Sequence, residues 1–251
     1  MVVEVRMPRV LREYELTGIR KTIAERLSYS HRYAPSAAIA LEVDLTNAFK
    51  LRRKIKEEGG EVSLTAIIVK AVALALREHP LLNAWIEGMK VRILKDINIC
   101  IAINTEHGLY APVIFNADKL RLVEITERIK ILAEKARKFS LSLEDLTGGT
   151  FTVSNLGPYD VDFFIPVINP PQTGILGVGA AKERPEGSGR ISSIFTLVFD
   201  HRVLDGVEAA NFLRDVRDIL SNPESLESPG SGSVSYTHLR AHETEADLVC
   251  R

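Results

Sequence analysis

The segment from Ala66 to Leu76 is apolar on almost every side of a helix, and Lys70 is its one charged residue. A helix that is hydrophobic all round is buried on most sides. Ser63 just before it is a good N-cap residue, and Pro80 beyond it cannot continue a helix. A chain of 251 residues, 45% of them hydrophobic, is long enough to surround such a helix. We therefore expect a layered domain with this helix inside it.

Segments on both sides of this helix predict the strands of a sheet. Residues 39–45 alternate apolar and polar side chains, as a half-buried strand does. Isoleucines recur at every second position from Ile97 to Ile103, a β-branched pattern typical of strands, and Ile93 precedes them. We expect residues 109–115 to pair with this segment across a turn at 106–108. Other apolar runs predict three further strands, at residues 150–154, 174–180 and 191–199.

Four more segments predict helices, with a short helical turn starting at Ser142. Thr17 and Thr46 are candidate N-caps for two of them, and Gly59-Gly60 ends the second. The helices are expected at residues 17–31, 46–58, 120–138 and 206–220. Strands and helices mix here without a strict strand–helix–strand repeat. This pattern predicts an α/β sandwich with a mixed sheet in two layers.

Composition excludes several classes of function. The net charge of −1 gives no reason to expect a nucleic acid or an anionic membrane as partner. The two cysteines, Cys100 and Cys250, are too few for a disulfide framework and lack the spacing of metal ligands. Residues 1–10 carry charges and no long apolar core, so we expect no signal peptide, and no apolar run reaches the roughly 20 residues of a membrane span. We expect a reducing compartment, the cytoplasm or, in a eukaryote, the mitochondrial matrix.

The most informative motif is Phe-Asp-His-Arg-Val-Leu-Asp-Gly, residues 199–206, at the junction of an expected strand and helix. His201 has a side chain that titrates near neutral pH, and Asp205 stands four residues later, so the pair is a candidate proton-transfer site. The same spacing also arises for structural reasons, because residues four apart are neighbours on a helix. The motif therefore needs support from the rest of the chain.

This motif resembles the Asp-His-Arg-x-x-Asp-Gly motif of the dihydrolipoamide acyltransferases, the E2 components of 2-oxo acid dehydrogenase complexes. Other segments between Leu16 and Leu226 resemble the catalytic domain of that family in the same order. They are residues 19–27, 42–46, 64–85, 97–102, 108–113, 150–157 and 168–179. The resemblance implies the fold of the CoA-dependent acyltransferases, which chloramphenicol acetyltransferase shares.

The resemblance implies transfer of an acyl group between dihydrolipoamide and coenzyme A, without a metal. His201 aligns with the catalytic base, and Ser154 with the serine that donates a hydrogen bond to the oxyanion. Asp205 would hold the active-site loop through an ion pair with Arg20, rather than move protons. Asn155 is a candidate substrate contact and Gly206 a candidate for a tight turn. Two blander roles stay open: Ser154 bonded to its own backbone, and Arg20 as a solvated charge.

The resemblance also implies partners. The family active site lies between subunits of a homotrimer, so His201 of one chain would face Ser154 of a neighbour, and trimers would assemble into a larger core through residues 222–226. The parent complex supplies the lipoyl group on a separate domain and adds E1 and E3 components. We expect an irregular lead-in at residues 1–15, a catalytic domain at 16–228 and a flexible tail at 229–251. The tail resembles translated cloning sequence and is set aside.

Two features depart from the family pattern. After Gly157, where more glycine is usual, the chain places the acids Asp160 and Asp162, which could alter the substrate channel. Cys100 replaces a common glycine, and we interpret it as a small buried residue. Two alternatives remain at this point: a stand-alone CoA-dependent acyltransferase of the chloramphenicol type, and a non-catalytic self-assembling scaffold. The sequence does not choose among acetyl, succinyl and branched-chain acyl groups.

Overall fold

The computed structural model describes residues 9–106, 108–184 and 189–226, and it is built around one seven-stranded sheet. The strands follow the order β1-β11-β9-β8-β4-β7, and β10 pairs with β11 beside this path. Their bounds are β1 (Ser36–Asp44), β4 (Ile99–Ile101), β7 (Val113–Ile114), β8 (Phe151–Asn155), β9 (Gly174–Val178), β10 (Lys182–Glu183) and β11 (Ile191–Asp200). Strand β8 runs parallel to β4 and β9, and the other pairs are antiparallel. The predicted mixed sheet is confirmed.

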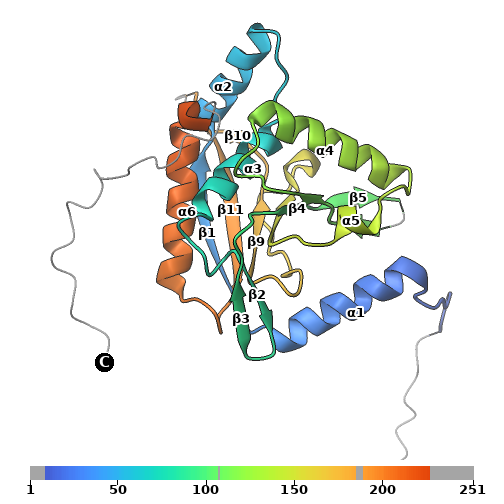
Figure 1. Cartoon of the computed structure of the whole chain (residues 1–251). Helices are drawn as coiled ribbons and strands as arrows, with labels where there is room; N and C mark the ends of the chain where they lie inside the picture. The colour runs from blue at the N-terminus through green and yellow to red at the C-terminus, as the bar shows by residue number, and fades with distance from the viewer. Residues whose placement is uncertain (1–8, 107, 185–188, 227–251) are drawn as a thin grey trace, which may run out of the picture.

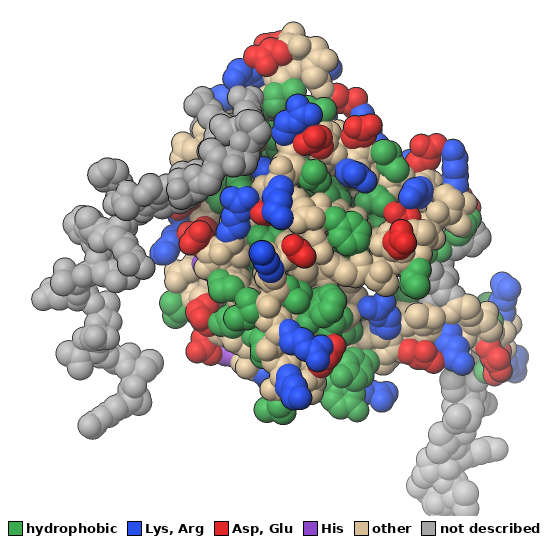
Figure 2. Space-filling model, in the orientation of Figure 1, with side chains coloured by type: hydrophobic (Ala, Val, Ile, Leu, Met, Phe, Trp, Pro, Cys, Tyr) green, Lys and Arg blue, Asp and Glu red, His purple; other side chains and the backbone are tan. Residues whose placement is uncertain are grey.

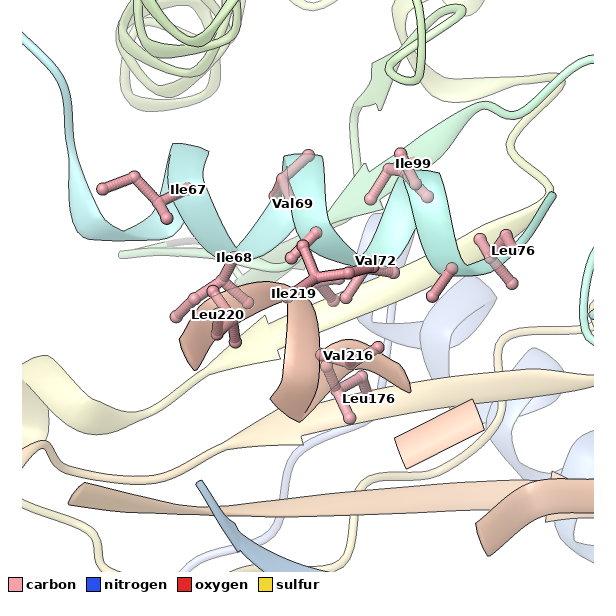
Figure 3. Packing of buried hydrophobic residues seen from close by; sticks show 14 of the residues in the cluster. Ile67, Ile68, Val69, Val72, Leu76, Ile99, Leu176, Val216, Ile219 and Leu220 are labelled. Carbon is pink, nitrogen blue, oxygen red and sulfur yellow. The ribbon is translucent and has the colours of Figure 1, made fainter. Parts of the chain in front are cut away.

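Four helices cover one face of this sheet: α2 (Thr46–Glu57), α3 (Leu64–Ala75), α4 (Leu122–Arg137) and α6 (Gly206–Ser221), with the short α5 (Leu143–Leu146) near the sheet edge (Figure 1). Helix α3 lies inside this layer, where Ile68 and Val72 lie beside residues of α6 such as Ile219 (Figure 3). Beneath them, the sheet contributes Leu176 to the same core. The helix that is apolar all round is therefore buried as predicted.

The ends of these helices test the predicted caps. Ser63 accepts a hydrogen bond from the backbone nitrogen of Ala66 at 3.1 Å, so it caps α3 as predicted. Thr46 does not cap α2, because it is the first helical residue and its own backbone nitrogen donates to Asp44 Oδ1 at 2.9 Å. Asp44, two residues earlier, therefore satisfies one of the free amides of the first turn of α2 in place of a side-chain N-cap.

The opposite face of the sheet is covered by irregular chain, residues 161–172, and by the end of α1 (Gly18–Tyr33). Ser30 donates to the carbonyl of Ile168 at 2.7 Å, and Arg26 donates to the carbonyl of Pro170 at 3.0 Å. Ile168 packs on Ile175 and Val198 from this side. The sheet is therefore closed on one side by helices and on the other by a strap that α1 holds in place.

Two short hairpins lie outside the main sheet. β2 (Ala84–Glu87) pairs with β3 (Lys90–Ile93), a hairpin that the sequence analysis missed. β5 (Ile103–Thr105) pairs with β6 (Gly108–Tyr110). The strand expected at residues 109–115 is wrong as a single element. It divides at Pro112, which has no amide to donate to a ladder, so β6 pairs with β5 and β7 with β4.

The surface carries mixed charge. Lys and Arg side chains alternate with Asp and Glu over the face drawn in Figure 2, in keeping with the net charge of −1. Helix α1 projects from the lower edge of the domain (Figure 1), and Leu27, Tyr29 and Tyr33 on it are exposed. In the part of the chain that the structure describes, every helix is too short or too polar to cross a membrane. The predicted tail at residues 229–251 lies outside the described residues.

Candidate active site

His201 follows the last residue of β11, and its backbone is held on both sides. Its amide donates to the carbonyl of Pro35 at 3.0 Å, and the preceding amide, of Asp200, donates to Thr173 at 2.9 Å. The side chain is half exposed and lies against the ring of Phe199, with ring centroids 5.4 Å apart. The sheet therefore presents an accessible imidazole from a fixed backbone position.

Asp205 begins α6 one turn after the histidine. Its Oδ1 lies 3.7 Å from His201 Nδ1, too long for a strong hydrogen bond, and its side chain is 84% exposed. Its backbone amide donates to Glu208 at 3.0 Å, which satisfies one free amide at the helix start. Gly206 has no positive φ, and a Cβ there would meet nothing within 4 Å, so the expected need for glycine at this turn is not supported.

The residues on each side of His201 form an ion pair that the sequence analysis gave no role. Asp200 is 1% exposed, and Arg202 donates to its two carboxylate oxygens from Nε at 2.9 Å and Nη2 at 2.6 Å. The hydrogen bonds that Arg202 donates to Asp200 raise the pKa of Arg202. An acid directly after the apolar run of residues 191–199, with an arginine two residues later, was the available sequence signal.

Ser154 lies in β8 and is half buried, on the sheet face away from the helices. Its cross-strand partner in β9 is Gly177. Its hydroxyl makes no hydrogen bond with any residue that the structure describes, so the alternative in which it bonds its own backbone is not observed. Asn155 beside it donates to Thr65 at 3.2 Å and accepts from the amide of Gly157 at 2.8 Å. The amide of Asn155 is therefore engaged in holding the chain, which leaves little of it for a substrate.

Ser154 and His201 lie far apart in one chain. Ser154 is level with Gly177 in β9, which is level with Thr196 in β11. His201 comes five residues after Thr196, about 17 Å along the strand, and two strand spacings add about 10 Å sideways. The two α-carbons are therefore about 19 Å apart, and their side chains cannot act on one carbonyl within a single chain.

Arg20 does not pair with Asp205 in this chain. It lies near the start of α1, where its Nε is 4.0 Å from the position of a Cβ built on Gly108. Thirteen residues of helix separate it from Tyr33, about 20 Å at 1.5 Å per residue. The end of α1 at Tyr33 is the one that adjoins His201, through Pro35. The expected pair is therefore not formed within one chain, because Arg20 lies at the end of α1 that is away from His201.

The sequence model described as "2-oxoacid dehydrogenases acyltransferase (catalytic domain)" matches residues 9–227. The chain belongs to this family. It is 36% identical over 224 residues to the dihydrolipoyllysine-residue acetyltransferase component of the acetoin cleaving system of Bacillus subtilis, covering 85% of this chain and 56% of the relative. It is 37% identical to a mitochondrial succinyltransferase component of the 2-oxoglutarate dehydrogenase complex of Arabidopsis thaliana, covering 86% and 48%. The chain thus spans about half the length of the curated relatives it matches.

Solved structures agree with this assignment. The dihydrolipoamide acetyltransferase of Azotobacter vinelandii superposes with a TM-score of 0.81 at 28% identity, covering 89% of this chain and 99% of that one. That work addressed the catalytic roles of a serine, a histidine and an asparagine four residues after the histidine. The cubic core of a pyruvate dehydrogenase complex matches with a TM-score of 0.81 at 29% identity and the same coverage. Chloramphenicol acetyltransferase matches at 0.55 and 19% identity, covering 78% and 94%, which shows the shared fold. The expected fold class is confirmed.

The two acids that depart from the family pattern are already paired. Lys182 in β10 contacts Asp160 Oδ1 at 3.0 Å and Asp162 Oδ1 at 2.6 Å. The hydrogen bond that Lys182 donates to Asp162, and then the one to Asp160, raises the pKa of Lys182. The acids therefore form a surface cluster with a cation, rather than projecting as free charges.

Cys100 is buried in β4, as predicted. Gln172 donates to its Sγ at 3.3 Å, and burial raises the pKa of the thiol. A Cβ built on Gly149 would lie 2.1 Å from this sulfur, so the glycine makes room for it. Among the described residues, no three His, Cys, Asp or Glu side chains gather closely enough to hold a metal ion.

Proposed function

We propose that this chain is the catalytic core of a dihydrolipoamide acyltransferase, which moves an acyl group between dihydrolipoamide and coenzyme A. The observation that carries the proposal is the accessible His201 on a rigid turn, at the family's histidine position, in a chain that belongs to that family. Ser154 supports it with a half-buried hydroxyl that is free to donate. The relatives act in 2-oxo acid and acetoin complexes, so the parent complex would supply the lipoyl group and the E1 and E3 components, in the cytoplasm or the mitochondrial matrix.

The chemical task is to make a thiol nucleophilic near neutral pH, where little of it is ionised. His201 accepts the proton of the coenzyme A thiol as its sulfur bonds to the carbonyl carbon of the acyl-dihydrolipoamide thioester. The carbonyl electron pair moves to oxygen, and the hydroxyl of Ser154 donates a hydrogen bond to that oxyanion. When the carbonyl reforms, the bond to the lipoyl sulfur breaks and His201 returns the proton to that sulfur. The products are acyl-coenzyme A and dihydrolipoamide.

This mechanism needs more than one chain, and we propose a homotrimer with the site between subunits. The separation of about 19 Å between His201 and Ser154 supports a shared site. Helix α1 supports it too, because a 16-residue helix with little burial is marginal by itself. A row of apolar side chains on the strap, Phe163, Ile165 and Val167, is also exposed in the single chain. Both surfaces suit burial against a second copy.

Higher assembly is proposed from a structural relative that forms a cubic core. The segment expected to make those contacts, residues 222–226, includes the short helical turn η2 (Pro223–Leu226). Leu226 is buried in the core of its own chain, against α2 and α3. The side chain of Leu226 is therefore not available for a contact between trimers.

The test is thioester formation from acetyl-CoA and dihydrolipoamide, with succinyl-CoA and isobutyryl-CoA as parallel donors. His201→Ala should lower kcat by about 10²-fold or more, because a positioned base contributes that much. Light scattering on both proteins separates the alternatives. Assembly with turnover supports the acyltransferase, and the best donor defines its acyl group. Assembly without turnover of any donor supports the scaffold, and a monomer contradicts both.

A further inference from the structure

The two residues that flank His201 are joined to each other around it. Asp200 is the last residue of β11 and is 1% exposed, whereas Arg202 is 31% exposed. Arg202 reaches back past the histidine to the buried carboxylate, with Nε at 2.9 Å from one oxygen and Nη2 at 2.6 Å from the other. This bidentate geometry fixes the plane of the carboxylate as well as its distance.

The same carboxylate and the carbonyl of Asp200 also organise the backbone of the turn. The amide of Arg202 donates to Asp200 Oδ1 at 3.1 Å, and the amide of Val203 donates to the Asp200 carbonyl at 2.9 Å. His201 is therefore the central residue of a loop that closes on Asp200 from both its backbone and its side chain. The loop is anchored to the sheet through the amides of Asp200 and His201.

The imidazole itself has few side-chain constraints. It touches the ring of Phe199, its Nδ1 lies 3.7 Å from a carboxylate that is mostly in water, and half of its surface is exposed. Its direction therefore depends on the direction of the Cα–Cβ bond, which the loop sets. A general base works only within hydrogen-bonding reach of the proton it removes.

We propose that the Asp200–Arg202 ion pair is a positioning device for the catalytic histidine: Arg202 clamps the loop so that His201 points at the thiol. This inference rests on the proposed acyltransferase function. Arg202 touches no reacting atom in this scheme and acts through the histidine. A buried ion pair contributes little to stability compared with apolar residues, so its location around His201 is the stronger reason for its presence.

The test compares steady-state kinetics of Arg202→Ala and Arg202→Lys with those of the parent. A displacement of about 1 Å at a catalytic group costs about 10²-fold, so we expect Arg202→Ala to lose about that factor in kcat while KM for acetyl-CoA stays within about threefold. Lysine keeps the charge but lacks the bidentate fork, so Arg202→Lys should fold and assemble yet also lose kcat. Added guanidinium, at concentrations that leave the parent unaffected, should restore kcat to Arg202→Ala and not to His201→Ala.

Arg217→Ala is the matched control, because Arg217 also donates from Nε and Nη2 to a neighbouring acid, Asp218, at 2.8 Å, and is similarly exposed at 38%. It lies in the last turns of α6 and should keep the parent kcat. The proposal is overturned if Arg202→Lys assembles with the parent kcat, if the loss is all in KM or in assembly, or if guanidinium does not rescue. If the parent protein turns over none of the acyl-CoA donors, the proposed function is contradicted instead. The parent is assayed first, so this outcome is separate from any comparison of variants.

Discussion

Mixing two inactive variants should restore activity if the site is shared between chains. His201→Ala removes the base and Ser154→Ala removes the oxyanion donor, so each variant alone should lose about 10²-fold or more in kcat. The two positions are about 19 Å apart in one chain, along β11 and across two strand spacings. A site that uses both residues therefore takes the histidine from one subunit and the serine from the next.

The expected recovery follows from the symmetry of a ring of three. Each subunit contact is head-to-tail, so each of the three sites takes its histidine from one subunit and its serine from the next. At equal mixing about three quarters of the trimers contain both variants, and each of these has a single site with both native residues. One third of the sites in three quarters of the trimers gives about one quarter of the parent activity.

The assay uses the two variants with different affinity tags, expressed together and purified through both tags in turn. Doubly tagged trimers contain one native site in three, so they should show about one third of the parent kcat, or about one quarter where trimers associate into larger particles, with the parent KM. The singly tagged proteins and a mixture made after assembly are the controls, and both should remain at the level of the single variants.

Doubly tagged trimers with no more activity than either variant would refute the reasoning. They would show that His201 and Ser154 do not meet across a subunit contact. Recovery in the mixture made after assembly would instead indicate rapid exchange of subunits, which a time course detects.

Three further predictions concern the fold. Hydrogen bonds from the amide of Ser142 and from Lys135 lower the pKa of Asp145. Asp145→Ala should therefore lose about 1 kcal/mol of unfolding free energy at pH 7. This loss is present above the unfolded pKa of about 3.9 and fades as the pH falls through the lower folded pKa. Denaturant titrations at a series of pH values measure it, and Glu144→Ala, at an exposed position, should show little change. Burial raises the pKa of Cys100, so this thiol should resist iodoacetamide at pH 8 in a Cys250→Ser chain until the protein is unfolded; fast native labelling read by mass spectrometry would contradict this. Lys70→Met should lower the free energy of unfolding by about 2 kcal/mol, because the ammonium of Lys70 donates to the backbone carbonyls of Asp118 and Leu120, each at 2.7 Å. An unchanged melting curve would count against that role.

Sequence patterns located the elements best where one physical signal dominated. The alternation at residues 39–45 identified β1, and the continuous apolar face of residues 66–76 identified α3 as a buried helix. Both signals come from burial, which acts on every residue of the segment. The β2–β3 hairpin gave no such signal, because all of β3 is exposed and β2 joins the rest of the chain through an isolated bridge between Trp85 and Gln172 rather than through a ladder. Its turn at Gly88, with φ of 60°, was the local clue.

The sequence predicted which residues are candidates for the site, but not which of them contact one another. The motif at 199–206 identified His201, and the structure places it at the strand end as expected. The expected pair of Arg20 and Asp205 is not formed within the single chain, where most of α1 is exposed, and it stays a prediction for the assembled protein. A helix that buries so little of its surface on its own chain cannot be placed from the sequence pattern of that chain.

The contrast between these two parts of the molecule bears on how the site works. The loop around His201 is closed by contacts within its own chain, through Asp200, Thr173 and Pro35. The residue that would complete the site, Ser154, lies near the strap, whose apolar side chains are exposed in the single chain. In the proposed trimer, a base that its own chain holds rigid would meet the oxyanion donor only after assembly, so turnover would depend on the subunit contact. In that arrangement a substitution in the loop should change kcat in fully assembled protein. A substitution in the strap should change the concentration at which activity appears, because it acts on the association equilibrium.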